Sequence, residues 1–143
     1  MAITQGMCDS FKVQLLNGQQ NFSSQTFKIA LYTSAATISN STATYTTSNE
    51  VTGSAGYTAG GNTLSVSVTP TSTGNVAYLS FANTSWTAAT ISANGALIYN
   101  STGPVANAAV CALNFGSTIT STAGTFTVVF PTAAAGTAII QIA

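Results

Sequence analysis

Apolar residues alternate with Thr, Ser or other small residues along several short stretches, and this two-residue period constrains the fold more than any other feature. Residues 26–33 (TFKIALYT) and residues 63–69 (TLSVSVT) show the alternation most clearly. Successive side chains of a β-strand point to opposite faces, so the period predicts strands with one face toward a core. The chain contains 25 Thr and 17 Ser. Thr is β-branched and favours strands, whereas Ser and the 12 Gly favour turns.

The same pattern continues to the end of the chain. We expect further strands over residues 75–81, 90–99, 105–115, 125–130 and 138–142. Residues 90–99 are expected as two short runs hinged at Asn94-Gly95, a pair typical of a turn or a bulge. Residues 70–74 (PTSTG) predict a turn, and residues 34–50 and 53–61 predict surface loops, the first of them alternatively a weak edge strand. About eight strands at this spacing predict an all-β, single-domain β-sandwich, jelly-roll-like or alternatively immunoglobulin-like, over residues 26–143.

One short helix is expected in an N-terminal arm of residues 1–25. Ser10 is the expected N-cap, residues 11–17 the helix and Gly18 the residue that ends it. Phe11, Leu15 and Leu16 fall on or beside one face of this helix. A helix this short is marginal alone, so we expect it to dock on another surface.

Ionisable side chains are almost absent, which excludes most functional classes. Only 3 % of the 143 residues are charged, the net charge is zero and there is no His. The four charges are Asp9, Lys12, Lys28 and Glu50. Neither nucleic acid nor an anionic membrane surface is an expected partner. Histidine-based catalytic triads and clusters of metal ligands cannot form, so we predict no enzymatic activity, no cofactor and no bound metal.

The cysteines and the aromatic residues are expected to pack in the core or at an interface and not to take part in catalysis or ligand binding. No basic segment followed by an apolar core precedes Cys8, so we expect no secretory signal and two reduced thiols at Cys8 and Cys111. A lone Trp is more often a core or interface residue than a platform for a ligand. The candidate subunit-interface residues are Phe11, Leu15, Leu16, Tyr57 and Trp86.

Six segments in a fixed order carry a family resemblance. They are residues 3–22 (ITQGMCDSFKVQLLNGQQNF), 26–37 (TFKIALYTSAAT), 46–64 (TTSNEVTGSAGYTAGGNTL), 89–102 (ATISANGALIYNST), 109–116 (AVCALNFG) and 130–133 (FPTA). In this order the chain resembles a family of small virion structural proteins of tailed bacteriophages. The segments span nearly the whole sequence and carry no catalytic motif.

The resemblance implies a virion component that is assembled in the host cytoplasm. Its expected role is that of a capsid decoration (cement) protein, which stabilises the phage head by bridging capsid subunits. The partners would be the major capsid protein and further copies of the chain, with a homotrimer as the expected oligomer. The alternative is a tail- or fibre-associated receptor-binding module, whose loops 34–50 and 53–61 would contact host surface glycans through Tyr45, Tyr57 and Asn side chains.

Overall fold

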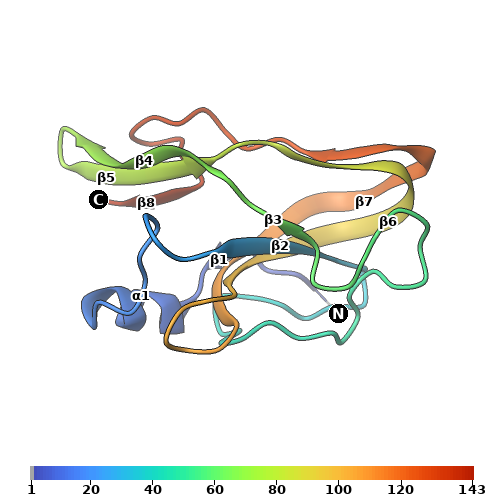
Figure 1. The fold of residues 1–143 in the computed structure, drawn as a ribbon, viewed down its shortest axis with the longest axis horizontal. Helices are drawn as coiled ribbons and strands as arrows, with labels where there is room; N and C mark the ends of the chain where they lie inside the picture. Colours follow the sequence, from blue (N-terminus) through green and yellow to red (C-terminus); the bar gives the residue numbers. More distant parts are fainter. Residues whose placement is uncertain (1) are drawn as a thin grey trace.

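The computed structural model describes residues 2–143 and shows an all-β sandwich with one short helix. Its two sheets are antiparallel (Figure 1). The larger has the strand order β1-β7-β6-β2-β3, and the smaller has the order β4-β5-β8. The strands of the larger sheet are β1 (Gly6–Met7), β2 (Phe27–Tyr32), β3 (Asn62–Thr63), β6 (Thr84–Asn100) and β7 (Ala108–Val128). The smaller sheet contains β4 (Val66–Thr73), β5 (Val76–Phe81) and β8 (Ile140–Ile142). The predicted sandwich is therefore confirmed.

Strands β6 and β7 form a long hairpin that dominates the larger sheet. It runs from the Thr84–Val128 pair to the Asn100–Ala108 pair. Two strands predicted over residues 105–115 and 125–130 are thus one 21-residue strand. The prediction failed because most of residues 116–124 are exposed and rich in Thr and Ser, yet their backbone still pairs with β6. At Asn94-Gly95, where a turn or a bulge was expected, the register with β7 shifts as in a bulge, but the two expected runs belong to one continuous strand.

Strand β4 also differs from expectation. Residues 70–74 were expected to form a turn, but Pro70 lies inside β4 and the chain reverses at Gly74, whose φ is +62°. Proline cannot donate a backbone hydrogen bond and is tolerated in edge strands and bulges. β4 is an edge strand, and its register with β5 shifts between Val68 and Thr71, so both conditions are met.

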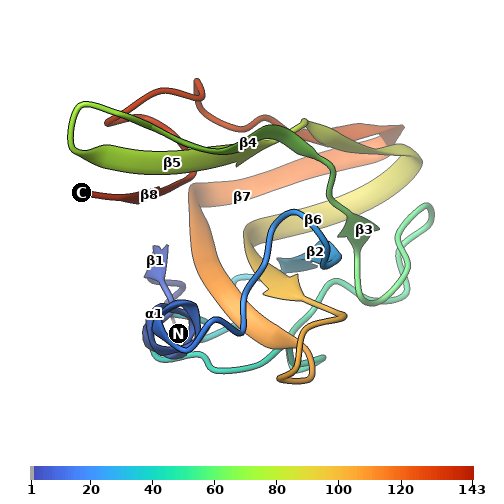
Figure 2. The same ribbon diagram turned by 60° about the vertical axis from the view of Figure 1, so that its left-hand side comes forward.

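The core lies between the two sheets and continues under helix α1 (Asp9–Leu16). A run of aromatic rings joins these parts. Phe22 stacks on Phe27 with ring centroids 4.3 Å apart, and Phe11 meets Phe22 edge-on at 6.0 Å. Phe81 packs between Phe27 and Phe130 at 6.2 and 5.8 Å. Figure 2 shows α1 at the end of the molecule where β8 and the C-terminus also lie.

Candidate interaction surface

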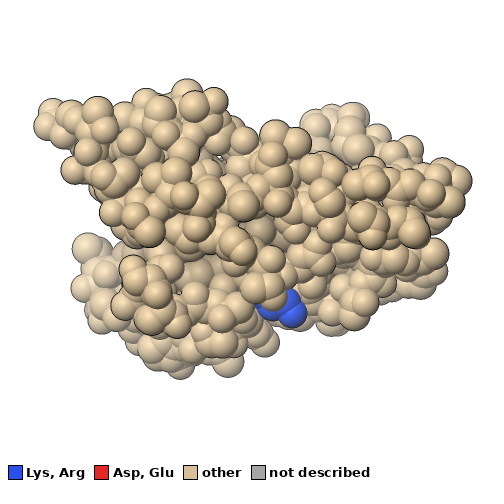
Figure 3. Space-filling view, turned by 45° about the horizontal axis from the view of Figure 1, so that its top comes forward, with Lys and Arg blue, Asp and Glu red and all other residues tan. Residues whose placement is uncertain are grey.

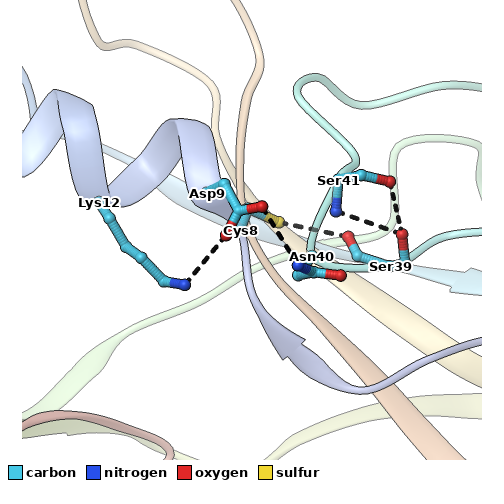
Figure 4. A network of polar contacts seen from close by, with 6 residues as sticks. All are labelled: Cys8, Asp9, Lys12, Ser39, Asn40 and Ser41. Atoms are coloured by element: carbon cyan, nitrogen blue, oxygen red, sulfur yellow. Dashed lines mark hydrogen bonds and ion pairs between the residues drawn. The ribbon is translucent and has the colours of Figure 1, made fainter.

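Hydrogen bonds fix the N-terminus of helix α1 to the loop around Asn40 (Figure 4). The Asp9 carboxylate accepts a bond from Asn40 Nδ2 at 3.1 Å, and the Asp9 backbone N–H donates to the Asn40 carbonyl at 2.8 Å. Lys12 Nζ lies 3.0 Å from the same carboxylate. The hydrogen bond and charge of Lys12 lower the pKa of Asp9, with a smaller contribution from Asn40. The helix is thus held in one orientation.

The predicted N-cap of helix α1 was wrong, whereas the predicted C-terminal end is confirmed. The N-cap is Cys8 and not Ser10, because the extended backbone at Cys8 hydrogen-bonds to the Val110 carbonyl as β1 ends. Ser10 lies inside the helix, and its buried hydroxyl has no hydrogen-bond partner within residues 2–143. Gly18 ends the helix as expected, with φ of +68° and a bond from its N–H to the Leu15 carbonyl.

Helix α1 departs in part from the usual polarity of a surface helix, because it buries one amide and exposes two apolar side chains. Phe11 is fully buried and Gln14 is 8 % exposed, whereas Val13 is 58 % and Leu16 90 % exposed. Buried Gln14 is satisfied: its Oε1 accepts a bond from Gln20 Nε2 at 2.6 Å. A surface helix normally turns its apolar residues toward the core and its polar residues toward water. Helix α1 thus leaves Val13 and Leu16 as apolar side chains on the surface of the chain.

An apolar groove lies beside these exposed residues. One cavity of about 290 Å³ separates α1 and the loop after it from strands β5 and β8. A second, of about 330 Å³, adjoins it at the end of the helix. We call the two together the α1 groove and define it by the apolar residues Met7, Leu15, Leu16, Leu79 and Ile142. Ile142 is itself 52 % exposed.

The five predicted interface residues separate into two groups. Leu15 and Leu16 line the α1 groove, as expected for contact with a neighbour. Phe11 is fully buried, but it lines the cavity of about 290 Å³ and so contributes to the wall of the groove. Trp86 is 4 % exposed, so of its two predicted roles, core or interface, the structure gives it the core role. Trp86 packs edge-on against Phe126 at 6.1 Å and lies 5.8 Å from the half-buried Tyr57. These residues belong to the core because they fill the space between β6, β7 and the loop of residues 52–61.

The buried carboxylate of Glu50 was not predicted from the sequence. Glu50 is 3 % exposed. Its Oε1 accepts hydrogen bonds from the Tyr57 hydroxyl and the Gly60 N–H, both at 2.7 Å, and its Oε2 accepts one from the Tyr45 hydroxyl at 2.6 Å. The Tyr57 hydroxyl also accepts a bond from the Leu31 N–H at 2.9 Å. Glu50 therefore ties two loops to each other and, through Tyr57, to strand β2.

The tyrosines around Glu50 are held in their protonated form. Burial, followed by the charge of Glu50, raises the pKa of Tyr99 to about 12. Burial also raises the pKa values of Tyr32, Tyr45 and Tyr57, and each rises further because Glu50 is near. Burial is the main cause at every position because it penalises the charged phenolate. These hydroxyls act as hydrogen-bond donors, which suits a structural role.

Few other side chains in the described part of the chain are nucleophiles or possible metal ligands. Cys8 and Cys111 are free and buried. Burial raises the pKa of the Cys8 thiol to about 11 and also raises that of Cys111. Residues 2–143 contain no cluster of three or more His, Cys, Asp or Glu residues suited to a metal ion. No helix within that range has both the length and the apolar character needed to cross a membrane.

Comparison of the chain with models of protein families, with curated proteins and with solved structures finds no match in any of the three.

Proposed function

We propose that this chain is a virion structural protein of a tailed bacteriophage, most specifically a capsid decoration (cement) protein. It would bind the major capsid protein and further copies of itself, and stabilise the head by bridging capsid subunits. The observation that carries the proposal is the apolar groove beside α1, at which Leu16 lies 90 % exposed. Exposed apolar surface of this kind is typical of proteins that function in assemblies.

The scarcity of surface charge supports the same proposal. Figure 3 shows a face on which a single basic patch interrupts an otherwise uncharged surface. The one ion pair among the described residues, Lys12 with Asp9, is internal to helix α1. A net charge of zero favours association. Such a surface suits a protein that is permanently packed against neighbours in a shell.

Resistance to salt tests the proposal on particles. Contacts made by apolar and hydroxyl groups are not screened by ions, so washing purified particles with about 1 M NaCl should leave the protein attached. Quantitative protein gels of the washed particles and the supernatant would measure this. A charged tail protein of the same particle that is released by salt serves as the control for the wash. Release of this chain by the wash would contradict attachment through uncharged contacts.

The receptor-binding alternative has less support. It assigned glycan contact to Tyr45 and Tyr57, but both hydroxyls donate hydrogen bonds to Glu50 inside the protein. Tyr45 is also stacked on Tyr99, with ring centroids 4.6 Å apart. A sugar would therefore have to compete with internal hydrogen bonds. Saturable binding on a glycan array would favour this alternative.

A further inference from the structure

The chain contains two Asn-Gly pairs, Asn17-Gly18 and Asn94-Gly95, which the fold places in opposite environments. In such a pair the glycine nitrogen can attack the side-chain amide of the preceding asparagine, because glycine has no side chain to obstruct the attack and its backbone rotates freely. We propose that Asn17 is a site of spontaneous deamidation in the folded protein and that the fold protects Asn94. The inference is independent of the proposed function, because it follows from the folded chain alone.

The reaction uses water as its one co-reactant and releases ammonia. The backbone nitrogen of Gly18 loses its proton to hydroxide and forms a bond to Cγ of Asn17. The bond between Cγ and the side-chain nitrogen breaks, and that nitrogen leaves as ammonia after taking a proton from water. Water then opens one of the two carbon–nitrogen bonds of the resulting five-membered imide. The product is an aspartate or an isoaspartate residue at position 17.

The surroundings of Asn17 allow the rotation that this attack requires. Asn17 is the exposed C-cap of helix α1, and Gly18 after it is exposed as well. A Cβ placed on Gly18 would meet no atom of the described residues within 4 Å, so the backbone has free space around it. The Gly18 N–H donates to the Leu15 carbonyl at 3.1 Å, a bond of the last helical turn. Helix ends open locally at almost no cost in free energy, so this nitrogen is released frequently.

The surroundings of Asn94 oppose the same rotation. Gly95 is buried in β6, which pairs with β2 on one side and with β7 on the other at this residue. A Cβ placed on Gly95 would lie 2.8 Å from Cδ1 of Ile3. The Asn94 Oδ1 accepts a hydrogen bond from the Thr118 hydroxyl at 2.9 Å. Attack by Gly95 would require the central strand of the larger sheet to separate, which costs nearly as much free energy as global unfolding.

Deamidation at Asn17 would change the charge of an almost uncharged molecule. The net charge would pass from zero to minus one, because a neutral amide becomes a carboxylate. The new charge would lie at the C-terminal end of α1, where the partial charge of the helix is already negative. It would also directly follow Leu16, which lines the α1 groove. Asn17→Asp should therefore have a lower thermal midpoint than Asn17→Gln, which keeps the neutral amide.

Peptide mass spectrometry of the full-length protein, incubated in mildly alkaline buffer with and without urea, tests the inference. In the native protein Asn17 should deamidate at least about tenfold faster than Asn94, because a frayed helix end opens far more often than a central strand. In urea both pairs are free of the fold, so the difference should disappear. Asn94 in the same molecules is thus the matched control. Equal rates in the native protein, no deamidation of Asn17, or a difference that persists in urea would each overturn the inference.

Isoelectric focusing of variants gives a second readout. Wild type and Asn94→Gln should accumulate a more acidic form during incubation, whereas Asn17→Gln should not, because a glutamine would have to close a larger and less favourable ring. Asn17 is exposed, so Asn17→Gln should fold normally, and circular dichroism checks that. An acidic form that persists in Asn17→Gln, or that Asn94→Gln abolishes, would contradict the assignment to Asn17. If Asn94→Gln does not fold, the peptide rates in the wild-type protein still decide between the two sites.

Discussion

Removal of the Glu50 carboxylate should destabilise the fold by an amount that its hydrogen bonds allow us to work out. Glu50→Ala takes the acceptor away from the Gly60 N–H, a buried donor, and from the hydroxyls of Tyr45 and Tyr57. An orphaned buried donor costs about 1–3 kcal/mol. The two half-buried hydroxyls can turn toward water, so each adds about 0.5–1 kcal/mol. The expected loss in the free energy of unfolding is therefore about 2–5 kcal/mol.

Equilibrium unfolding in urea measures this loss, and Trp86 provides the signal. Trp86 is the only tryptophan, is 4 % exposed and lies 5.8 Å from the Tyr57 ring. Glu50→Gln retains one acceptor oxygen and should cost less, about 1–2 kcal/mol. Thr52→Ala changes an exposed hydroxyl in the same loop and should stay within about 0.5 kcal/mol of wild type. If Glu50→Ala unfolds within about 1 kcal/mol of wild type, the structural role assigned to Glu50 is wrong.

Three further predictions follow from burial. Phe11→Ala should lower the free energy of unfolding by about 3–5 kcal/mol in the same urea assay, because Phe11 is fully buried. Leu16→Ala should change it by less than about 0.5 kcal/mol, because Leu16 is exposed. Equal effects of the two variants would contradict the orientation of α1, with Phe11 inward and Leu16 outward. Raised tyrosine pKa values mean that the native state keeps protons that the unfolded chain loses near pH 10, so stability should fall as the pH rises above about 10. Absorbance titration should then show delayed phenolate formation in the native protein compared with the protein in urea, and coincident titrations would refute the buried cluster. Both thiols should react with a thiol reagent only after denaturation, since Cys8 and Cys111 are buried and their pKa values are raised; rapid reaction of the native protein would contradict that burial.

The sequence predicted the fold class well and the strand boundaries less well. Alternation located β2 and β5 almost to the residue, although β2 is covered on both faces and not on one. It failed for β7, where most Thr and Ser of residues 116–124 remain exposed while their backbone pairs with β6. A hydrogen-bonded strand with no buried face leaves no hydrophobic period in the sequence. The turn predicted at Pro70 was wrong for a related reason. An edge strand can accommodate a proline, and the sequence does not show which strand will lie at the edge of a sheet.

The candidate surface could be predicted only in part. The sequence indicated Leu15 and Leu16, because a short apolar helix needs a partner, but it could not separate them from Phe11, which faces inward. That separation depends on the direction in which the 38–42 loop holds α1. The burial of Glu50 was equally hidden, because its three donors lie up to 10 residues away along the chain and have no motif.

The number of copies of this chain in a purified phage particle tests the central claim most directly. Quantitative mass spectrometry against the major capsid protein of the same particles would supply it, with isotope-labelled peptides of both proteins as standards. A decoration protein that bridges capsid subunits should be present in hundreds of copies, in a fixed ratio to the capsid protein. A handful of copies would move the protein to the tail, and absence from the particles would contradict a virion role altogether.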